Sequence, residues 1–160
     1  MSLKNIIVTA IAILVLVCLD QASKEFLVHY LKTQPGYMVE IWPFLDVIYT
    51  WNYGISFGLF REYFQYSNYI FLVLNSVIIV YIIYLLWTTK EFIAKIGIIL
   101  IIGGALGNLA DRIYRGAVFD FIHFNYGWFS FPAFNLADAF ITIGACFFFY
   151  SYLFISKESS

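Results

Sequence analysis

The stretch "GGALGNLADRIYRGAVFDFI", residues 103–122, decides the interpretation of this chain, because it sets charged residues directly after a long uncharged run. It contains four charges within ten positions: Asp111, Arg112, Arg115 and Asp120. The whole chain of 160 residues is 62% hydrophobic and only 12% charged, and its mean hydropathy is +0.84. These values lie far above those of an ordinary soluble domain and predict a membrane protein. The length, without repeats or linkers, predicts a single domain over residues 1–160.

Charged residues delimit four apolar runs, at residues 5–19, 63–89, 96–110 and 139–156. A helix needs about 20 apolar residues to cross a bilayer, and only the second run reaches that length alone. The sequence therefore predicts longer spans that include charged neighbours: about 5–30, 66–89, 94–113 and 136–156. A charge at mid-span costs at least about 2.5 kcal/mol, less near the interface, so charged residues within these spans are candidates for function.

Two segments outside the predicted spans, residues 32–62 and 113–135, are rich in aromatic and β-branched residues with Gly and Pro between them. This composition is typical of short strands, here lying at the membrane surface. An even number of spans places both termini on one side, and Lys90 and Lys95 favour that side as cytoplasmic. The predicted fold is an all-α membrane protein of four transmembrane helices with a small extracytoplasmic β-rich cradle and cytoplasmic termini.

Polar residues on the first and third spans have helical spacing. Asp20 and Lys24 are four residues apart and can pair, either to neutralise the helix end or as part of a site. Asn108, Asp111 and Arg112 share one face of the third span, where Asn108 could also serve only to join helices. Two further expectations concern packing: Gly103 and Gly107 allow close helix approach, and Arg115 snorkels to the interface.

Two aspartates are the best candidates for chemistry. Asp138 lies three residues after Asn135, which can cap the fourth helix, and is followed by a long uncharged run. Asp120 lies in a strand-like, strongly apolar segment, which is an unfavourable place for an idle charge. If Asp120 and Asp138 converge, they share a proton, so that one activates a water while the other polarises a carbonyl. Their separation in sequence does not by itself specify this convergence.

Several classes of function lack support in the sequence. The net charge is −1 with scattered basic residues, which gives no reason to expect nucleic acid as a partner. Cys18 and Cys146 lie in apolar runs and are expected to be small buried residues. Neither they nor His29 and His123 have the spacing of metal ligands, so neither a metal nor a cofactor is predicted.

Two alternatives to an enzyme remain open. One is a small membrane transporter or channel with an aspartate-lined polar site, although such a site usually has charges near the span centres. The other is a structural membrane subunit whose polar residues only join helices. The transporter alternative is disfavoured by the position of the charges, which cluster toward one side of the membrane.

Four motifs in order, taken together, resemble the bacterial lipoprotein signal peptidases, also called type II signal peptidases. They are "DQASK" (20–24), "NYGISFG" (52–58), "GGALGNLADRIYRGAVFDFI" (103–122) and "FPAFNLADAFI" (131–141). The similarity extends from the first span to the fourth. One mild departure is Ser56, where many members of the family have Ala.

This resemblance implies an intramembrane aspartyl endopeptidase that removes the signal peptide from prolipoproteins, cutting on the amino side of a diacylglyceryl-modified cysteine. It implies Asp120 and Asp138 as the catalytic pair. Supporting or substrate-binding positions are implied for Asp20, Lys24, Asn52, Gly54, Asn108, Asp111, Arg112 and Asn135. We also expect a monomer in the bacterial inner membrane, in contact with membrane lipid, with its active site on the extracytoplasmic side.

Overall fold

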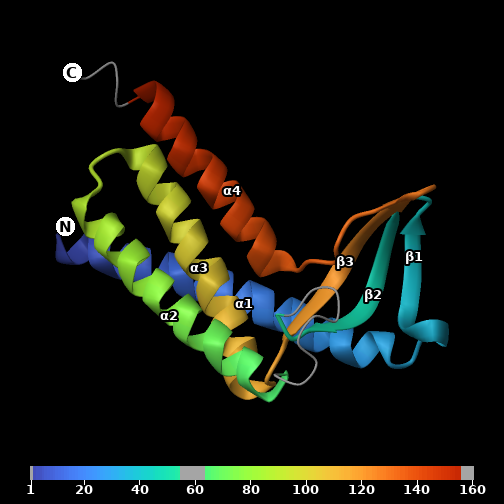
Figure 1. The fold of residues 1–160 in the computed structure, drawn as a ribbon. Helices are drawn as coiled ribbons and strands as arrows, with labels where there is room; N and C mark the ends of the chain where they lie inside the picture. The colour runs from blue at the N-terminus through green and yellow to red at the C-terminus, as the bar shows by residue number, and fades with distance from the viewer. Residues whose placement is uncertain (1, 55–63, 156–160) are drawn as a thin grey trace.

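The computed structural model describes residues 2–54 and 64–155, and it places four long helices beside one small sheet (Figure 1). The helices are α1 (Leu3–Leu31), α2 (Phe64–Thr88), α3 (Phe92–Tyr114) and α4 (Leu136–Tyr150), the last continued by a π-helical segment, Ser151–Ile155. All four are long and apolar enough to cross a membrane. The prediction of four apolar helices is confirmed. The start of α1 and the end of α4 lie at the same end of the helices, and the sheet lies at the other end (Figure 1).

The sheet is antiparallel with the strand order β1-β2-β3-β4. Its strands are β1 (Met38–Trp42), β2 (Leu45–Asn52), β3 (Val118–Tyr126) and β4 (Phe129–Ser130), and a 3-10 turn at Pro35–Tyr37 precedes β1. All the strands fall within the two segments predicted to form them, which confirms a small β region. In the pairing of β2 with β3, Thr50 lies opposite Asp120 and Asn52 opposite Val118. Ser56 lies outside the described residues.

Helix α3 is the centre of the helical part. It contacts α1, α2 and α4. Of the most apolar stretch of α3, 50% is buried inside the protein, against 6–11% of the corresponding stretch in each of the other three helices. Glycines permit this close packing: Gly103 faces Leu16 of α1, and Gly97 faces Gly144 of α4. A Cβ atom on Gly97 would lie 2.5 Å from the carbonyl oxygen of Gly144. A Cβ atom on Gly107 would lie 2.5 Å from Asp20 Oδ2 of α1, so the expected packing role of Gly103 and Gly107 is confirmed, and Gly97 and Gly144 extend it to α4.

The last turns of α1 attach the sheet to the helices. Val28 and Leu31 of α1 are buried against Phe119 and Phe121 of β3. The ring of Trp51 in β2 packs on Phe119, with 5.1 Å between ring centroids. Burying such aliphatic and aromatic side chains contributes about 1.5–3 kcal/mol each. This cluster fixes the sheet, and hence β3, next to the end of α1.

A fully buried ion network joins α1 to α3 at the same level. The Lys24 ammonium lies 2.8 Å from Asp20 Oδ2 and 2.8 Å from Asp111 Oδ2, and all three side chains are 0% exposed. The predicted pairing of Asp20 with Lys24 is thus confirmed. Arg115, expected to snorkel, forms ion pairs with Asp111 and Glu25. Its snorkelling stays a prediction, and the pairing with Glu25 of α1 is one that sequence spacing along α3 does not show.

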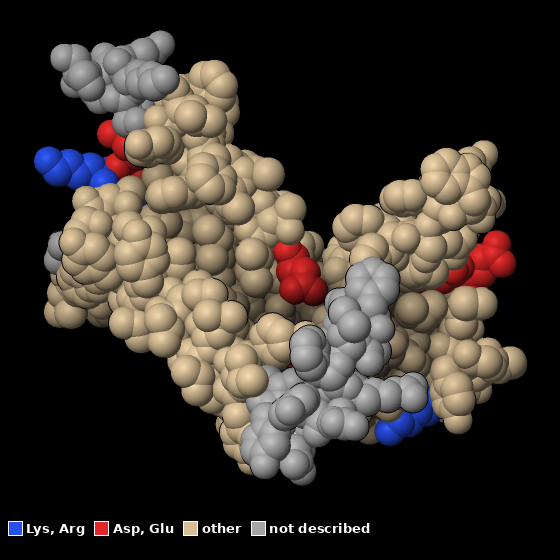
Figure 2. Space-filling view, viewed as in Figure 1, with Lys and Arg blue, Asp and Glu red and all other residues tan. Residues whose placement is uncertain are grey.

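The surface of the helices is mainly apolar, and the charges gather elsewhere. Figure 2 shows charged side chains at the two ends of the molecule and an acidic patch in a hollow between the helices and the sheet. The prediction that the two cysteines are buried was wrong, since Cys18 and Cys146 are both exposed. Their apolar surroundings reflect helix faces turned outward, because most of α1 and α4 lies at the protein surface.

The contact between α3 and α4 predicts a sharp sensitivity to one added methyl group. Gly97→Ala places a Cβ against the backbone of α4, so we expect the free energy of unfolding to fall by about 1–3 kcal/mol. Thermal unfolding in detergent measures this. The control is Cys146→Val, which adds bulk at an exposed position of α4. Equal melting temperatures for Gly97→Ala and wild type would contradict the described packing.

Candidate active site

Asp120 is held on β3 in a buried position, 2% exposed. Its two carboxylate oxygens each accept a side-chain amide: Asn52 Nδ2 donates to Oδ2 at 3.0 Å, and Asn135 Nδ2 donates to Oδ1 at 2.7 Å. Asn52 comes from the end of β2 and Asn135 from the residue before α4. Two separate segments therefore determine the orientation of one carboxylate.

Asp138 lies in the first turn of α4, where it forms a capping box with Asn135. The backbone N–H of Asn135 donates to Asp138 Oδ2 at 3.2 Å, and the N–H of Asp138 donates to Asn135 Oδ1 at 3.0 Å. A third donor comes from α3, since Asn108 Nδ2 lies 2.8 Å from Asp138 Oδ1. A carboxylate at a helix N-terminus is also favoured by the helix dipole. The predicted cap by Asn135 is confirmed.

Asn135 connects the two aspartates directly. Its Nδ2 donates to Asp120 Oδ1 and, at 3.1 Å, to Asn108 Oδ1, while its backbone and Oδ1 engage Asp138. Asn135 is 0% exposed and Asn108 is 6% exposed, so this network is largely shielded from water. The structure thus brings Asp120 and Asp138 to one site, eighteen residues apart in sequence.

Two other predicted site residues, Gly54 and Arg112, lie beside this pair. Gly54, with φ +85°, donates its N–H to Asn52 Oδ1 at 2.8 Å, and a Cβ on Gly54 would collide with the Phe71 ring. Gly54 therefore supports Asn52 rather than touching a carboxylate. The Arg112 guanidinium donates to the Asn108 carbonyl at 3.3 Å and lies 5.6 Å from the centroid of the Phe71 ring.

The remaining predicted residues, Asp20, Lys24 and Asp111, form the ion network behind the site. Lys24 Nζ donates to Asn108 Oδ1 at 3.0 Å, which joins that network to Asn108. Asp20 accepts the backbone N–H of Ala137 at 3.0 Å, and Asp111 accepts that of Phe119 at 3.3 Å. Ala137 directly precedes Asp138, and Phe119 directly precedes Asp120. Each of these two hydrogen bonds therefore holds the backbone beside one of the two central aspartates. The prediction that the ten polar and glycine positions form one site therefore agrees with their arrangement, although its functional assignment stays a prediction.

Burial raises the pKa of Asp120 to about 6, because the charged form loses contact with water. The hydrogen bonds from Asn52 and Asn135 act in the opposite direction by stabilising the carboxylate, and the charge of Asp138 raises the pKa further. A carboxyl group with a pKa near 6 can both hold and release a proton close to neutral pH.

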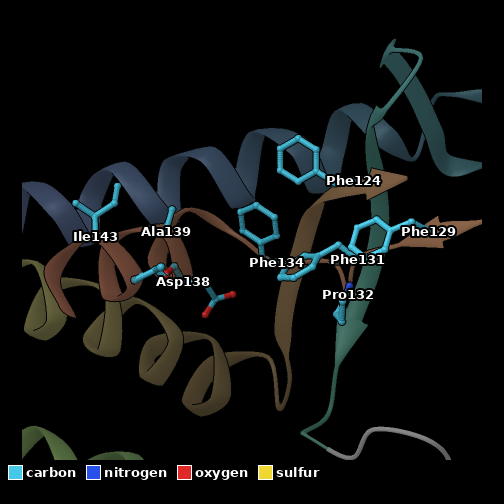
Figure 3. A pocket seen from close by; sticks show the side chains of 10 residues that line it. Phe124, Phe129, Phe131, Pro132, Phe134, Asp138, Ala139 and Ile143 are labelled. Atoms are coloured by element: carbon cyan, nitrogen blue, oxygen red, sulfur yellow. The ribbon is translucent and has the colours of Figure 1, made fainter. Parts of the chain in front are cut away.

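A cavity of about 710 Å³ opens beside Asp138. Figure 3 shows Asp138, Ala139 and Ile143 on one side of it and Phe124, Phe129, Phe131 and Phe134 on the other. Its lining is almost entirely apolar. Sequence reasoning placed these phenylalanines in a surface segment but did not identify them as the lining of a cavity. The density of Phe in "FSFPAF", directly before Asn135, is the signal that could have indicated it.

The arrangement suits acid–base chemistry on a substrate that is apolar except at one bond. Two carboxylates, one buried and one facing an apolar cavity, can position a water and a carbonyl group between them. Within residues 2–54 and 64–155, no group of three or more His, Cys, Asp and Glu side chains is placed to hold a metal ion. The prediction that no metal or cofactor takes part stays a prediction.

Comparison with known proteins places these features in a family. Residues 11–154 match the family described as "Signal peptidase (SPase) II". The lipoprotein signal peptidases of Rickettsia canadensis and Rickettsia felis are 55% and 56% identical to this chain over 132 residues, 82% of this chain and 67% of each relative.

Two solved structures have a similar fold. A bacterial membrane enzyme determined by the in meso method at 2.3 Å resolution has a TM-score of 0.76 and 25% identity, covering 96% of this chain and 92% of that one. A second bacterial membrane enzyme, determined by the same method at 1.9 Å resolution, has a TM-score of 0.75 and 27% identity, covering 92% and 94%. The family match extends over most of the four helices and the sheet, and the chain belongs to the signal peptidase II family.

Proposed function

We propose that this chain is an aspartic endopeptidase that removes the signal peptide from prolipoproteins, with Asp120 and Asp138 as its catalytic pair. The single observation that carries the assignment of the pair is the Asn135 side chain, which hydrogen-bonds Asp120 and also caps Asp138. Membership of the signal peptidase II family supports the substrate and the reaction. The transporter alternative is not favoured, because the carboxylates lie next to the sheet and not near the middle of the helices.

The two aspartates have different surroundings, and we assign them different roles. Asp120 is almost fully buried and has a raised pKa, so it carries the proton of the pair. Asp138 is half-buried and lines the cavity, where it is the carboxylate that meets a water molecule.

Hydrolysis then needs only these two groups and a water. The water oxygen attacks the carbonyl carbon while Asp138 takes a proton from the water. At the same time Asp120 gives its proton to the carbonyl oxygen. The resulting diol collapses: the C–N bond breaks, the leaving nitrogen takes the proton from Asp138, and Asp120 recovers a proton from a diol hydroxyl. Activity therefore falls as the pH rises through the pKa of Asp120, about 6 in the free site.

The apolar cavity supports a lipid-modified substrate. Its phenylalanines and Ile143 offer a surface for hydrocarbon beside Asp138, which is the only charged residue among the described residues of the lining. We propose that an apolar part of the prolipoprotein occupies this cavity. The scissile bond, on the amino side of the modified cysteine, then lies between Asp120 and Asp138.

The same proposal includes the setting of the enzyme. We infer that residues 1–160 form one integral membrane domain, a monomer, in the inner membrane, with the sheet and the aspartates on the extracytoplasmic side and both termini in the cytoplasm. The start of α1 and the end of α4 lie together at the end of the helices away from the sheet, which supports this orientation (Figure 1).

The catalytic pair predicts that Asp120→Asn and Asp138→Asn each lower kcat by about 10²–10⁴-fold, because each removes one proton-transfer group and keeps its size. Cleavage of a diacylglyceryl-modified prolipoprotein by purified protein in detergent measures this, with the unlipidated precursor as a second substrate. We expect cleavage of the lipidated form only.

The matched control is Asp46→Asn, another aspartate of the sheet, which is 6% exposed and bonds Asn125 instead of the site. Its kcat should equal that of wild type. Full activity in either site variant, with melting temperatures unchanged, would rule out the catalytic pair.

The cavity predicts a binding defect when it is filled. Thr142 lines it one turn after Asp138 and is exposed, so Thr142→Phe takes up space without disturbing a packed core. We expect KM for the lipidated substrate to rise about tenfold, or roughly 1.4 kcal/mol, with kcat little changed. Cys146→Phe, one turn further along the exposed surface and outside this cavity, is the control. Equal KM values for the two variants would contradict substrate binding in the cavity.

A further inference from the structure

Lys24 occupies an unusual position for a lysine, because its whole side chain is enclosed. It is 0% exposed, and its ammonium group has three acceptors: Asp20 Oδ2 and Asp111 Oδ2, each at 2.8 Å, and Asn108 Oδ1 at 3.0 Å. An enclosed cation is costly unless every N–H finds an acceptor, and these three acceptors use all of its donors. Two of the acceptors are counter-ions, whereas the third belongs to the active site.

Lys24 is not needed merely to neutralise the two carboxylates beside it. Asp111 also pairs with Arg115, and Asp20 also accepts the side-chain amide of Gln21 at 3.1 Å and the N–H of Ala137. With Lys24 and Arg115 set against Asp20 and Asp111, the four central charges balance, and Glu25 lies on the outer side of Arg115. The bond to the neutral Asn108 contributes nothing to that charge balance; it satisfies the third N–H of Lys24 and also acts on the Asn108 carboxamide at its other end.

The bond from Lys24 determines which way the Asn108 carboxamide points. Asn108 Oδ1 accepts from Lys24 Nζ and from Asn135 Nδ2, so the amide nitrogen must face the other way, toward Asp138 Oδ1 at 2.8 Å. A flipped amide would direct its N–H groups at two donors. A cationic donor on Oδ1 also polarises the amide, which strengthens the N–H bond to the carboxylate.

We propose that Lys24 is a positioning residue for the peptidase reaction, which acts through the Asn108 carboxamide to fix the position of the Asp138 carboxylate. The inference rests on the proposed function and adds a role for a residue that forms no hydrogen bond or ion pair with either proposed catalytic aspartate, Asp120 or Asp138. The charged groups around this relay are Asp20 and Asp111 behind it, Arg112 beside it on α3, and Asp120 and Asp138 in front of it.

The positive charge of Lys24 also acts on Asp120, in the direction that favours its ionised form. Loss of that charge therefore raises the pKa of Asp120, and the fall in activity at alkaline pH moves to higher pH. A residue with a purely structural role would not shift the pH profile, so the profile separates the two roles.

The test is a variant that removes Lys24 without leaving an unpaired charge. In Lys24→Met/Asp20→Asn one cation and one anion disappear together, and Arg115 still pairs with Asp111. We expect kcat to fall about tenfold, KM to stay near the wild-type value, and the alkaline limb of the kcat profile to move to higher pH. Asp46→Asn, which lies in the sheet outside this network, is the control and should retain a kcat and a pH profile close to those of wild type.

Asn108→Ala serves if the double variant is poorly folded. It deletes the relay while leaving Lys24 between Asp20 and Asp111, so the ion network that joins α1 to α3 remains. We expect a folded protein with a lower kcat and a melting temperature somewhat below that of wild type, because one N–H of Lys24 loses its acceptor. An unchanged kcat in folded Asn108→Ala overturns the proposal, whatever the double variant shows.

Each remaining outcome has one meaning. A folded double variant with wild-type kcat and an unshifted pH profile, beside a wild-type enzyme that cleaves, overturns the role of Lys24 and leaves the proposed function standing. A wild-type enzyme that does not cleave the lipidated substrate overturns the proposed function, and this inference with it.

Discussion

The hydrogen bonds of the Asn135 side chain are the constraint on which the rest of the site depends. Two carboxylates in an enclosed place repel each other, and each must be held by donors to remain there. Asn135 supplies donors to both, from its side chain to Asp120 and from its backbone to Asp138. Because the same residue caps α4, the start of that helix and the spacing of the carboxylates are determined together.

The buried polar groups behind Asn135 explain why a membrane protein contains so much charge in its helices. Lys24, Asp20 and Asp111 are fully enclosed, and each bonds a group adjacent to the site: Asn108, Ala137 N–H and Phe119 N–H respectively. Burying ions rarely stabilises a fold compared with apolar packing. Here the charges place β3 and the start of α4 relative to α1, while apolar contacts such as Gly97 against Gly144 bring the helices together.

Much of this arrangement could be predicted from the sequence, and the limits have physical causes. Hydropathy identified four apolar helices, and helical spacing identified the Asp20–Lys24 pair, because both are local patterns. The partners of Arg115 and the phenylalanines around the cavity were missed, since they depend on how α1 packs on α3 and how β4 faces α4. Cys18 and Cys146 were placed wrongly because, in a membrane protein, apolar sequence does not distinguish a buried helix face from an exposed one. The convergence of Asp120 with Asp138 follows from the register of β3 with β2 and the cap at Asn135, which sequence separation does not specify.

The central claim is that one of two neighbouring carboxylates, Asp120, holds a proton up to about pH 6, above the ordinary range of an aspartate. Infrared difference spectroscopy of the purified protein across a pH titration measures this directly, with Asp120→Asn as the reference. The account predicts a carboxylic acid band in wild type that is lost with a midpoint near pH 6 and is missing from Asp120→Asn. A wild-type spectrum without such a band, or a band that persists unchanged in Asp120→Asn, would contradict it.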